Sequence, residues 1–158
     1  MKEYSYIYDD NTFKKIKNNK NIYLILFVIL SIIIVTLNII LYFKINNLLT
    51  YSIILIVSNF ILINLDVLMF IKKVLILCKK YNFIVELING NKNELTYKFI
   101  KEDEEIIEKG LAYKVIMFTS KDNNEISLKV LKEYYFKLDE NKSYDLIQIG
   151  DYLYAISK

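Results

Sequence analysis

The sequence predicts a membrane protein of the α+β class, in which an N-terminal two-helix transmembrane hairpin precedes a small, mainly antiparallel β domain. Two long apolar runs lie close together near the N-terminus, and lysines flank them. From residue 83 onward the pattern changes to short apolar runs separated by turn residues. The predicted divisions are an N-terminal cytoplasmic segment, a first span, an external loop, a second span extended to about residue 80, and a cytoplasmic β domain: residues 1–21, 22–43, 44–50, 51–71 and 81–158.

The first apolar run, "IYLILFVILSIIIVTLNIILYF" at residues 22–43, carries no charge. At 1.5 Å per residue it crosses the ~30 Å hydrocarbon core of a bilayer. The second run, residues 51–71, has a similar length and one charge, Asp66. Two buried helices of a soluble protein are the alternative. A cleaved signal peptide is disfavoured, because the first run is too long and no alanine precedes Ala112.

The placement of lysines predicts the orientation of the hairpin. Five lysines precede the first span, Lys44 alone lies in the loop, and four membrane-boundary lysines follow the second span: Lys72, Lys73, Lys79 and Lys80. Because cytoplasmic loops are enriched in positive charge, both termini are expected on the cytoplasmic side. The abundance of Ile, Asn, Lys and Tyr is typical of an AT-rich bacterial genome, so the expected location is a bacterial plasma membrane.

Polar residues recur at intervals of seven within both apolar runs. Ser31 and Asn38 lie in the first run, and the second contains Ser52, Asn59 and Asp66. This repeat predicts a polar seam along which the two helices face each other or a second copy. Asp66 is interpreted as a helix-packing group, as a contact for a membrane-protein partner, or as part of an ion path. The bilayer and either a membrane-protein partner or a homo-oligomer are therefore the expected partners.

Six short segments of the C-terminal part are predicted to be strands, which favours a small barrel or sandwich of OB or SH3-like size: residues 83–88, 94–100, 111–119, 125–131, 144–149 and 151–157. "NGNKN", "KEDEEIIEKG" and "SKDNN" are predicted to be turns, and residues 134–138 a helical turn or a crossing strand. The alternating segment at residues 3–10 is predicted to pair with this sheet as an added strand.

The residue types argue against several kinds of chemistry. The chain has no His, no Arg and a single cysteine, Cys78, so a Cys-based zinc site and an internal disulfide are excluded. We expect no enzymatic activity and no cofactor. From residue 81 onward 11 Lys face 14 Asp and Glu, a net charge of −3, which disfavours nucleic acid as a partner.

Two chemical alternatives remain open in the β domain. Ser127 and Lys129 lie two residues apart on one predicted strand, so their side chains point the same way. They are interpreted either as a Ser–Lys nucleophile pair or as part of an ordinary solvated face. The acidic residues between 102 and 108 form either a loose calcium site or a solvated loop.

The stretch "YKVIMFTSKDNNEISLKVLKEYYFKL" followed by "YDLIQIGDYLYAIS" resembles the small barrels of several uncharacterised families of bacterial two-span membrane proteins. In these a strand, a polar hairpin and a second strand lead to a Y-x-x-L step, here residues 135–138, and to a Gly-Asp pair before the last strand, here Gly150 and Asp151. NfeD-like proteins are similar in architecture. The resemblance implies a fold and carries no site residues.

The function expected from these observations is that of a non-enzymatic accessory or scaffold subunit whose β domain binds a protein partner. One alternative is a self-protection protein of the bacteriocin-immunity type, in which the hairpin alone would protect. Another is a small transporter or channel subunit that uses Asp66 together with Asn59 and Asn38.

Overall fold

The structure, a computed structural model, describes residues 4–44, 48–120, 124–140 and 142–157. The chain forms two compact units, one of residues 16–78 and the other of residues 1–15 together with 79–158. We call the first the hairpin unit and the second the sheet unit, and describe each by itself.

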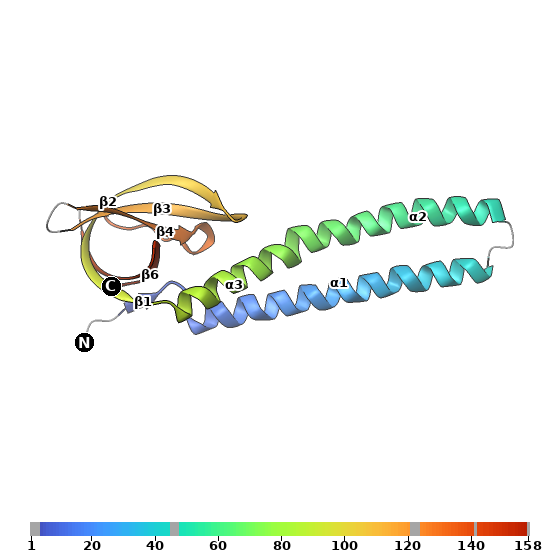
Figure 1. The fold of residues 1–158 in the computed structure, drawn as a ribbon, viewed down its shortest axis with the longest axis horizontal. Coiled ribbons are helices and arrows are strands. Elements are labelled where there is room, and N and C mark those ends of the chain that lie inside the picture. The colour runs from blue at the N-terminus through green and yellow to red at the C-terminus, as the bar shows by residue number, and fades with distance from the viewer. Residues whose placement is uncertain (1–3, 45–47, 121–123, 141, 158) are drawn as a thin grey trace. The chain divides into compact units, whose positions relative to one another are not determined.

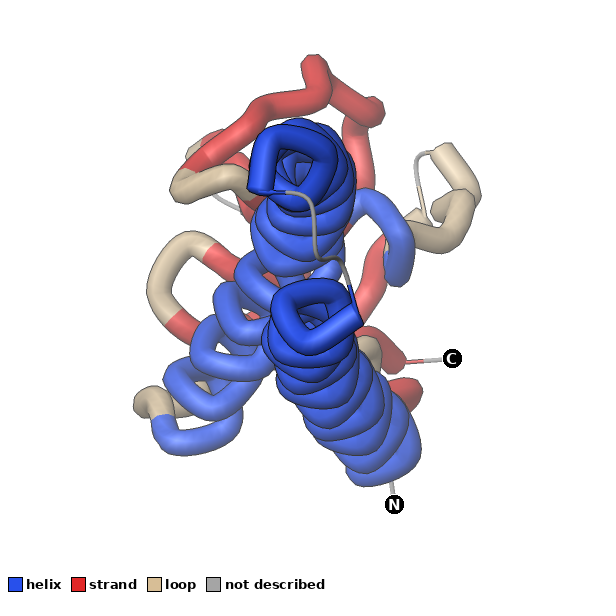
Figure 2. Tube along the Cα trace, turned by 90° about the vertical axis from the view of Figure 1, so that its right-hand side faces the viewer, coloured by secondary structure: helices blue, strands red, loops and turns tan. Residues whose placement is uncertain are grey.

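The hairpin unit is built from two long helices, α1 (Asp10–Lys44) and α2 (Leu48–Met69), which run side by side in opposite directions (Figures 1 and 2). Helix α1 begins one residue after Asp9, whose carboxylate accepts a hydrogen bond from the backbone N–H of Thr12 at 2.7 Å. This is a typical N-terminal cap, and it starts the helix well before the apolar run begins at Ile22.

The chain stays helical beyond α2. A π-helical segment, Phe70–Leu75, leads into α3 (Ile76–Asn89). In the part of the chain that the structure describes, two helical stretches are long and apolar enough to cross a membrane, Asp10–Lys44 and Leu49–Asn89.

The predicted strand at residues 83–88 is wrong, because these residues belong to α3. The buried side chains are Phe83, Ile84 and Leu87, a spacing that fits one face of a helix and not the alternation of a strand. Extending an existing helix adds one hydrogen bond per residue fixed, so continuation overrides the strand preference of Ile84 and Val85. "NGNKN" accordingly connects a helix to a strand.

The described residues of the sheet unit form six strands: β1 (Tyr4–Tyr6), β2 (Asn93–Glu108), β3 (Leu111–Thr119), β4 (Glu125–Leu131), β5 (Ser143–Ile149) and β6 (Tyr152–Ser157). Their order is β1-β6-β4-β3-β2-β5, and β6 also pairs with β5. All neighbouring pairs are antiparallel except β4 and β6, which meet in parallel at Lys129 and Tyr152. Figure 1 shows β2 as a long, strongly bent strand.

Five of the six predicted strands are confirmed, and so is the added N-terminal strand. β1 pairs with the last strand, with Tyr4 opposite Ser157 and Tyr6 opposite Ala155. The turn predicted for "KEDEEIIEKG" is wrong over most of its length. β2 continues to Glu108, with two register shifts against β3, and the turn contains only Lys109 and Gly110. The segment after β4 begins with a 3-10 turn, Lys132–Tyr134, which shares only Tyr134 with the predicted residues 134–138; residues 135–138 are neither helical nor a strand.

The core of the sheet unit draws on three parts of the chain. α3 contributes Phe83 and Leu87, the sheet contributes most of the buried aliphatic residues, and the N-terminal segment contributes Tyr8. Tyr8 is only 1% exposed, and its ring packs edge-on against Phe83 and Tyr134. The N-terminal segment is therefore part of the packed core of this unit.

Candidate functional site

The structure brings together four of the five polar residues predicted for the hairpin. Ser31 donates a hydrogen bond to Asp66 Oδ2 at 2.9 Å, and Asn38 Nδ2 donates to Asn59 Oδ1 at 2.8 Å. Both bonds join α1 to α2, and all four side chains are half-buried. The fifth residue, Ser52, lies on α2 and is exposed.

Asp66 is incompletely satisfied. Its Oδ1 atom is buried and has no hydrogen-bond partner among the described residues. The Ser31 hydroxyl carries a single hydrogen, yet it lies within donating distance of both Asp66 Oδ2 and the Phe27 carbonyl oxygen, the latter at 3.0 Å. One donor thus serves two acceptors, and the carboxylate has capacity for a further polar partner.

The four membrane-boundary lysines fall into two pairs. Lys72 and Lys73 lie in the π-helical segment and are exposed. Lys79 and Lys80 lie in the first turns of α3, and Lys80 forms a 2.5 Å ion pair with Glu133 of the 3-10 turn. Lys79 lines a cavity, which is the second candidate site.

This cavity has a volume of about 470 Å³ and lies in the sheet unit between α3, the β2–β3 turn and the β5–β6 turn. We call it the α3 cavity. Its lining consists of one face of α3 and residues from the two turns and the strands beside them: Lys79, Asn82, Phe83, Glu86, Leu87, Lys109, Leu111, Tyr113, Ile149, Gly150 and Tyr152.

Three aromatic rings form one wall of the α3 cavity. The Phe83 ring lies edge-on to Tyr113 and Tyr152, with centroids 5.5 and 4.9 Å away, and the two tyrosine rings are 5.7 Å apart. Burial raises the pKa of Tyr113 and of Tyr152, so both hydroxyls stay protonated at neutral pH. The wall is therefore apolar and uncharged, with two hydroxyl groups at its edge.

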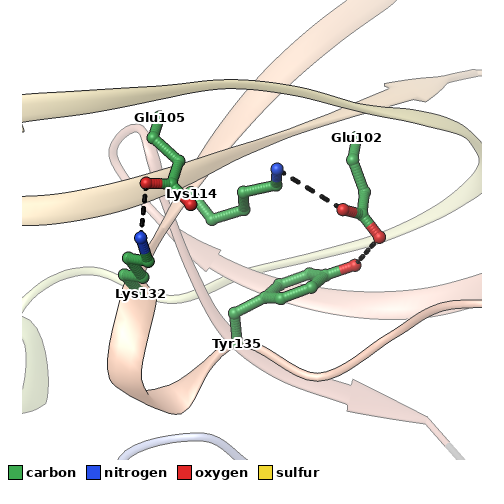
Figure 3. Close-up of polar contacts among 5 residues, drawn as sticks. All are labelled: Glu102, Glu105, Lys114, Lys132 and Tyr135. Atoms are coloured by element: carbon green, nitrogen blue, oxygen red, sulfur yellow. Dashed lines mark hydrogen bonds and ion pairs between the residues drawn. The ribbon is translucent and has the colours of Figure 1, made fainter.

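A second group of polar residues ties the acidic half of β2 to its neighbours (Figure 3). Glu105 forms a 2.6 Å ion pair with Lys132, while Glu102 pairs with Lys114 at 3.4 Å and accepts a hydrogen bond from the Tyr135 hydroxyl. Figure 3 shows the two glutamates pointing toward these three partners. The pKa of Glu102 is lowered, first by the Tyr135 bond and then by Lys114, and Lys132 lowers that of Glu105.

Glu108 completes this acidic strand by pairing with Lys129 at 2.9 Å. The three glutamates are thus matched to lysines of β3, of β4 and of the 3-10 turn that follows β4. Within the described ranges, no group of three or more acidic, His or Cys residues is arranged to hold a metal ion. These contacts account for the acidic residues as structural partners and explain why this stretch is a strand.

The pairing of Lys129 also bears on the Ser127–Lys129 alternative. The bond to Glu108 raises the pKa of Lys129, whereas a lysine that activates a nucleophile needs a lowered pKa. The geometry favours the interpretation of these two residues as an ordinary sheet face.

Sequence reasoning missed the α3 cavity because it treated residues 83–88 as a strand. A strand would have turned Phe83 and Leu87 to one side and left Glu86 and Asn82 elsewhere. The signal that was available is the helical spacing of Lys79, Phe83 and Leu87, which continues that of the second span. Comparisons with family models, curated proteins and solved structures gave no match to this chain.

Proposed function

We propose that this chain is a two-span membrane protein without enzymatic activity, an accessory or scaffold subunit whose sheet unit binds a protein partner on the cytoplasmic side. The observation that carries the proposal is the contrast between the two units. All but four of the exposed large apolar side chains in the described residues lie between Ile22 and Leu75. The four exceptions are Tyr6, Leu95, Ile107 and Phe136.

A surface of this kind suits lipid and not water. Phe60, for example, is 72% exposed on α2, and the polar side chains of Asn38 and Asn59 turn toward each other instead of outward. In hydrocarbon every backbone polar group must be satisfied within the span, and helices achieve this. The hydrogen bonds between α1 and α2 then serve to hold the hairpin together, each contributing roughly 0.6–2 kcal/mol.

The strand order supports the view of the sheet unit as a small binding barrel. The pairings β2–β3, β3–β4, β4–β6, β6–β5 and β5–β2 form a closed ring of five strands, in which only β4 and β6 are parallel. The long strand β2 pairs with two neighbours: its N-terminal part pairs with β5 and its C-terminal part with β3. These features agree with an OB-like barrel, and such barrels commonly serve as binding modules.

The single cysteine provides the test of the membrane topology. Cys78 follows the second apolar run, and Lys44→Cys in a Cys78→Ser background places a thiol in the predicted external loop. In intact cells an impermeant maleimide should label the Lys44→Cys protein but should label Cys78 only after the cells are opened. Labelling of Cys78 from outside, or of neither thiol, contradicts the proposal.

Partner binding is tested by affinity capture of the full-length protein in mild detergent from its native cell. Ile107 is 81% exposed on β2, so Ile107→Asp disturbs no packing and removes an apolar contact for a partner. The proposal expects one membrane complex to be captured by the wild type and depleted by this variant. Capture of no complex, or equal capture by both forms, counts against an accessory role.

A second candidate is supported by the unsatisfied Oδ1 atom of Asp66. Asp66 lies five residues inside the end of the second apolar run, about 8 Å at 1.5 Å per residue, and bonds to Ser31 of the first run. A carboxylate within a span costs up to roughly 3 kcal/mol at the centre of the bilayer, so a further polar partner from another membrane protein would be favourable. Loss of the captured complex in Asp66→Leu supports this contact, and an ion flux abolished by Asp66→Asn would instead favour a transport role.

A further inference from the structure

We propose that the α3 cavity binds an anionic amphiphile, a molecule that joins one phosphate or carboxylate group to an apolar body. The anionic group is held by Lys79 and Lys109, and the apolar body lies against the aromatic wall of Phe83, Tyr113 and Tyr152. This inference goes beyond the proposed partner binding and does not depend on it, because every residue involved lies in the sheet unit.

The walls of the cavity are preformed and mostly apolar. Leu87, Leu111 and Tyr113 are nearly fully buried, which holds their positions before a ligand arrives. Pockets of 300–1,000 Å³ with apolar walls and a few polar groups are typical of small-molecule sites, and about 470 Å³ lies within this range. The apolar part of the ligand is expected here.

Lys109 breaks a local rule of turn chemistry at the edge of this cavity. It has a φ of 51° and, with Gly110 at 80°, makes the two-residue connection between Glu108 and Leu111. Such turns favour Asn, Asp or Gly at the first position, because most L-residues are strained at positive φ, whereas glycine lacks a Cβ and the short side chains of Asn and Asp can hydrogen-bond locally. A lysine in this place, in a chain rich in asparagine, suggests that its ammonium group is needed at the cavity.

Lys79 approaches the same turn from α3. Its Nζ atom lies 2.8 Å from the position that a Cβ would take at Gly110, so the glycine leaves room for the ammonium group. The two lysines therefore reach one turn from two different elements, at the edge of a cavity that both of them line.

Neither of these two lysines forms an ion pair with a carboxylate that the structure describes, although Lys109 lies close enough to Glu108 to help lower the pKa of that carboxyl. Five lysines of the sheet unit form ion pairs: Lys80, Lys114, Lys129, Lys132 and Lys142. Lys79 and Lys109 form none with any carboxylate that the structure describes. Among the described residues Glu86 is the only acidic one in the lining, and nearby Glu108 has Lys129 as its ion-pair partner. The lining therefore carries a net charge of +1, which suits a ligand with a single negative charge.

Two sources supply molecules of this chemistry. Lys79 lies eight residues beyond the end of the second apolar run, so phospholipid headgroups are one source. Soluble fatty acids are the other. Both present one anionic group on an apolar body, and the experiment distinguishes them.

The experiment uses the full-length protein in nanodiscs of phosphatidylcholine, labelled with ¹⁵N-glycine. The chain has three glycines, and Gly110 and Gly150 border the cavity, so a few amide signals report on the site. Dispersed dihexanoylphosphatidylglycerol should shift the Gly110 and Gly150 signals in a saturable manner. Dihexanoylphosphatidylcholine, its zwitterionic counterpart, and inorganic phosphate alone should each bind at least tenfold more weakly.

Two further competition experiments identify the source of the ligand. If the bilayer supplies the ligand, long-chain phosphatidylglycerol in the nanodisc shifts the same two signals and competes with the short-chain probe. If a soluble acid is the ligand, decanoate competes for these signals and the long-chain lipid does not. Either result supports an anionic amphiphile as the ligand.

Variants with opposite expected effects make the assignment specific. Lys109→Asn relieves the backbone strain of the turn, so the variant should fold well. Because it lacks the ammonium group, its affinity for the anionic probe should be about tenfold lower. Glu86→Gln removes the opposing carboxylate and should bind more tightly. Lys132→Gln removes a lysine that does not line the cavity, and its affinity should equal that of the wild type.

Several results overturn the proposal. They are unchanged Gly110 and Gly150 signals with the anionic probe, equal binding of the zwitterionic probe, and equal affinity of Lys109→Asn and the wild type. Because the wild type and Lys132→Gln are measured in the same nanodiscs, a loss confined to Lys109→Asn is not a general electrostatic effect of the lipid surface.

Discussion

The hydroxyl of Tyr8 accepts a hydrogen bond from the backbone N–H of Leu131 at 3.0 Å, across 123 positions of the chain. The bond is buried, and burial raises the pKa of Tyr8 above its usual value, so the phenol remains neutral at physiological pH. Leu131 ends β4, and its N–H has this hydroxyl as its partner. The N-terminal segment therefore satisfies a polar group in the core of the sheet unit.

Tyr8→Phe should lower the stability of the sheet unit by about 1–3 kcal/mol, because the N–H of Leu131 is left buried without an acceptor. The measurement is native-state amide hydrogen exchange in β3, whose buried residues report opening of the unit. Tyr6→Phe is the matched control, since the Tyr6 side chain is 48% exposed, and its effect should stay within about 0.5 kcal/mol. Equal exchange in the two variants would show that the hydroxyl bond does not stabilise the core.

The sequence allowed this added strand to be predicted because Tyr4, Tyr6 and Tyr8 alternate with other residues near a predicted sheet. The same local reasoning failed at residues 83–88, where the strand preference of Ile and Val was overridden by a helix that had already begun. It also failed at residues 101–108, because the lysines that neutralise Glu102, Glu105 and Glu108 come from positions 12 to 27 residues further along the chain. Pairing across the sheet is not visible in a local pattern.

Of the two candidate sites, the polar residues of the hairpin could be predicted from a local sequence pattern, whereas the α3 cavity could not. The heptad spacing was sufficient to nominate Ser31, Asn38, Asn59 and Asp66, because the spacing of a helix is a local property. The α3 cavity depends on two turns and a helix that are distant in sequence. Lys79 was noticed only as a boundary charge, and Lys109 was placed inside an acidic turn, so their convergence on Gly110 required the fold.

Lys109→Asn should raise the free energy of unfolding of the sheet unit by about 0.5–1 kcal/mol, because Asn tolerates a positive φ better than Lys does. Lys109→Val should lower it, since a β-branched residue is strained most in this conformation. Urea unfolding followed by tyrosine circular dichroism measures both changes. Lys137→Asn serves as the control at an exposed residue without positive φ, and a Lys109→Asn protein no more stable than this control would remove the argument from turn strain.

The glutamates in the acidic half of β2 allow the pH dependence of stability to be predicted. The pKa values of Glu102, Glu105 and Glu108 are lowered in the folded state, chiefly by hydrogen bonds from Tyr135, Lys132 and Lys129 respectively. A lowered folded-state pKa stabilises the fold above the ordinary glutamate value of about 4.3. This stabilisation is lost as the pH falls from there through the lower folded-state values.

The melting temperature of the sheet unit should therefore be flat between pH 6 and 7 and fall below about pH 4.5. The variant Glu102→Gln/Glu105→Gln/Glu108→Gln should be less stable at pH 7 and should show a smaller fall on acidification. A wild type and a triple variant that lose stability in parallel would locate the acid sensitivity in other carboxylates.

The last prediction concerns the hairpin and rests on the hydrogen bond between Asn38 and Asn59. Asn38→Leu should weaken the association of α1 with α2 by roughly 0.6–2 kcal/mol in a membrane, because the amide loses its partner where lipid offers none. Thr36→Val is the control, since the Thr36 hydroxyl donates to the Ile32 carbonyl of its own helix and makes no bond to α2 among the described residues.

Steric trapping in bicelles measures the stability of the hairpin in both variants. The double variant Asn38→Leu/Asn59→Leu should be no less stable than Asn38→Leu alone, because the second change removes an amide that has already lost its partner. Additive losses from the two single changes would mean that the amides act independently, and the bond at 2.8 Å would then carry no coupling energy.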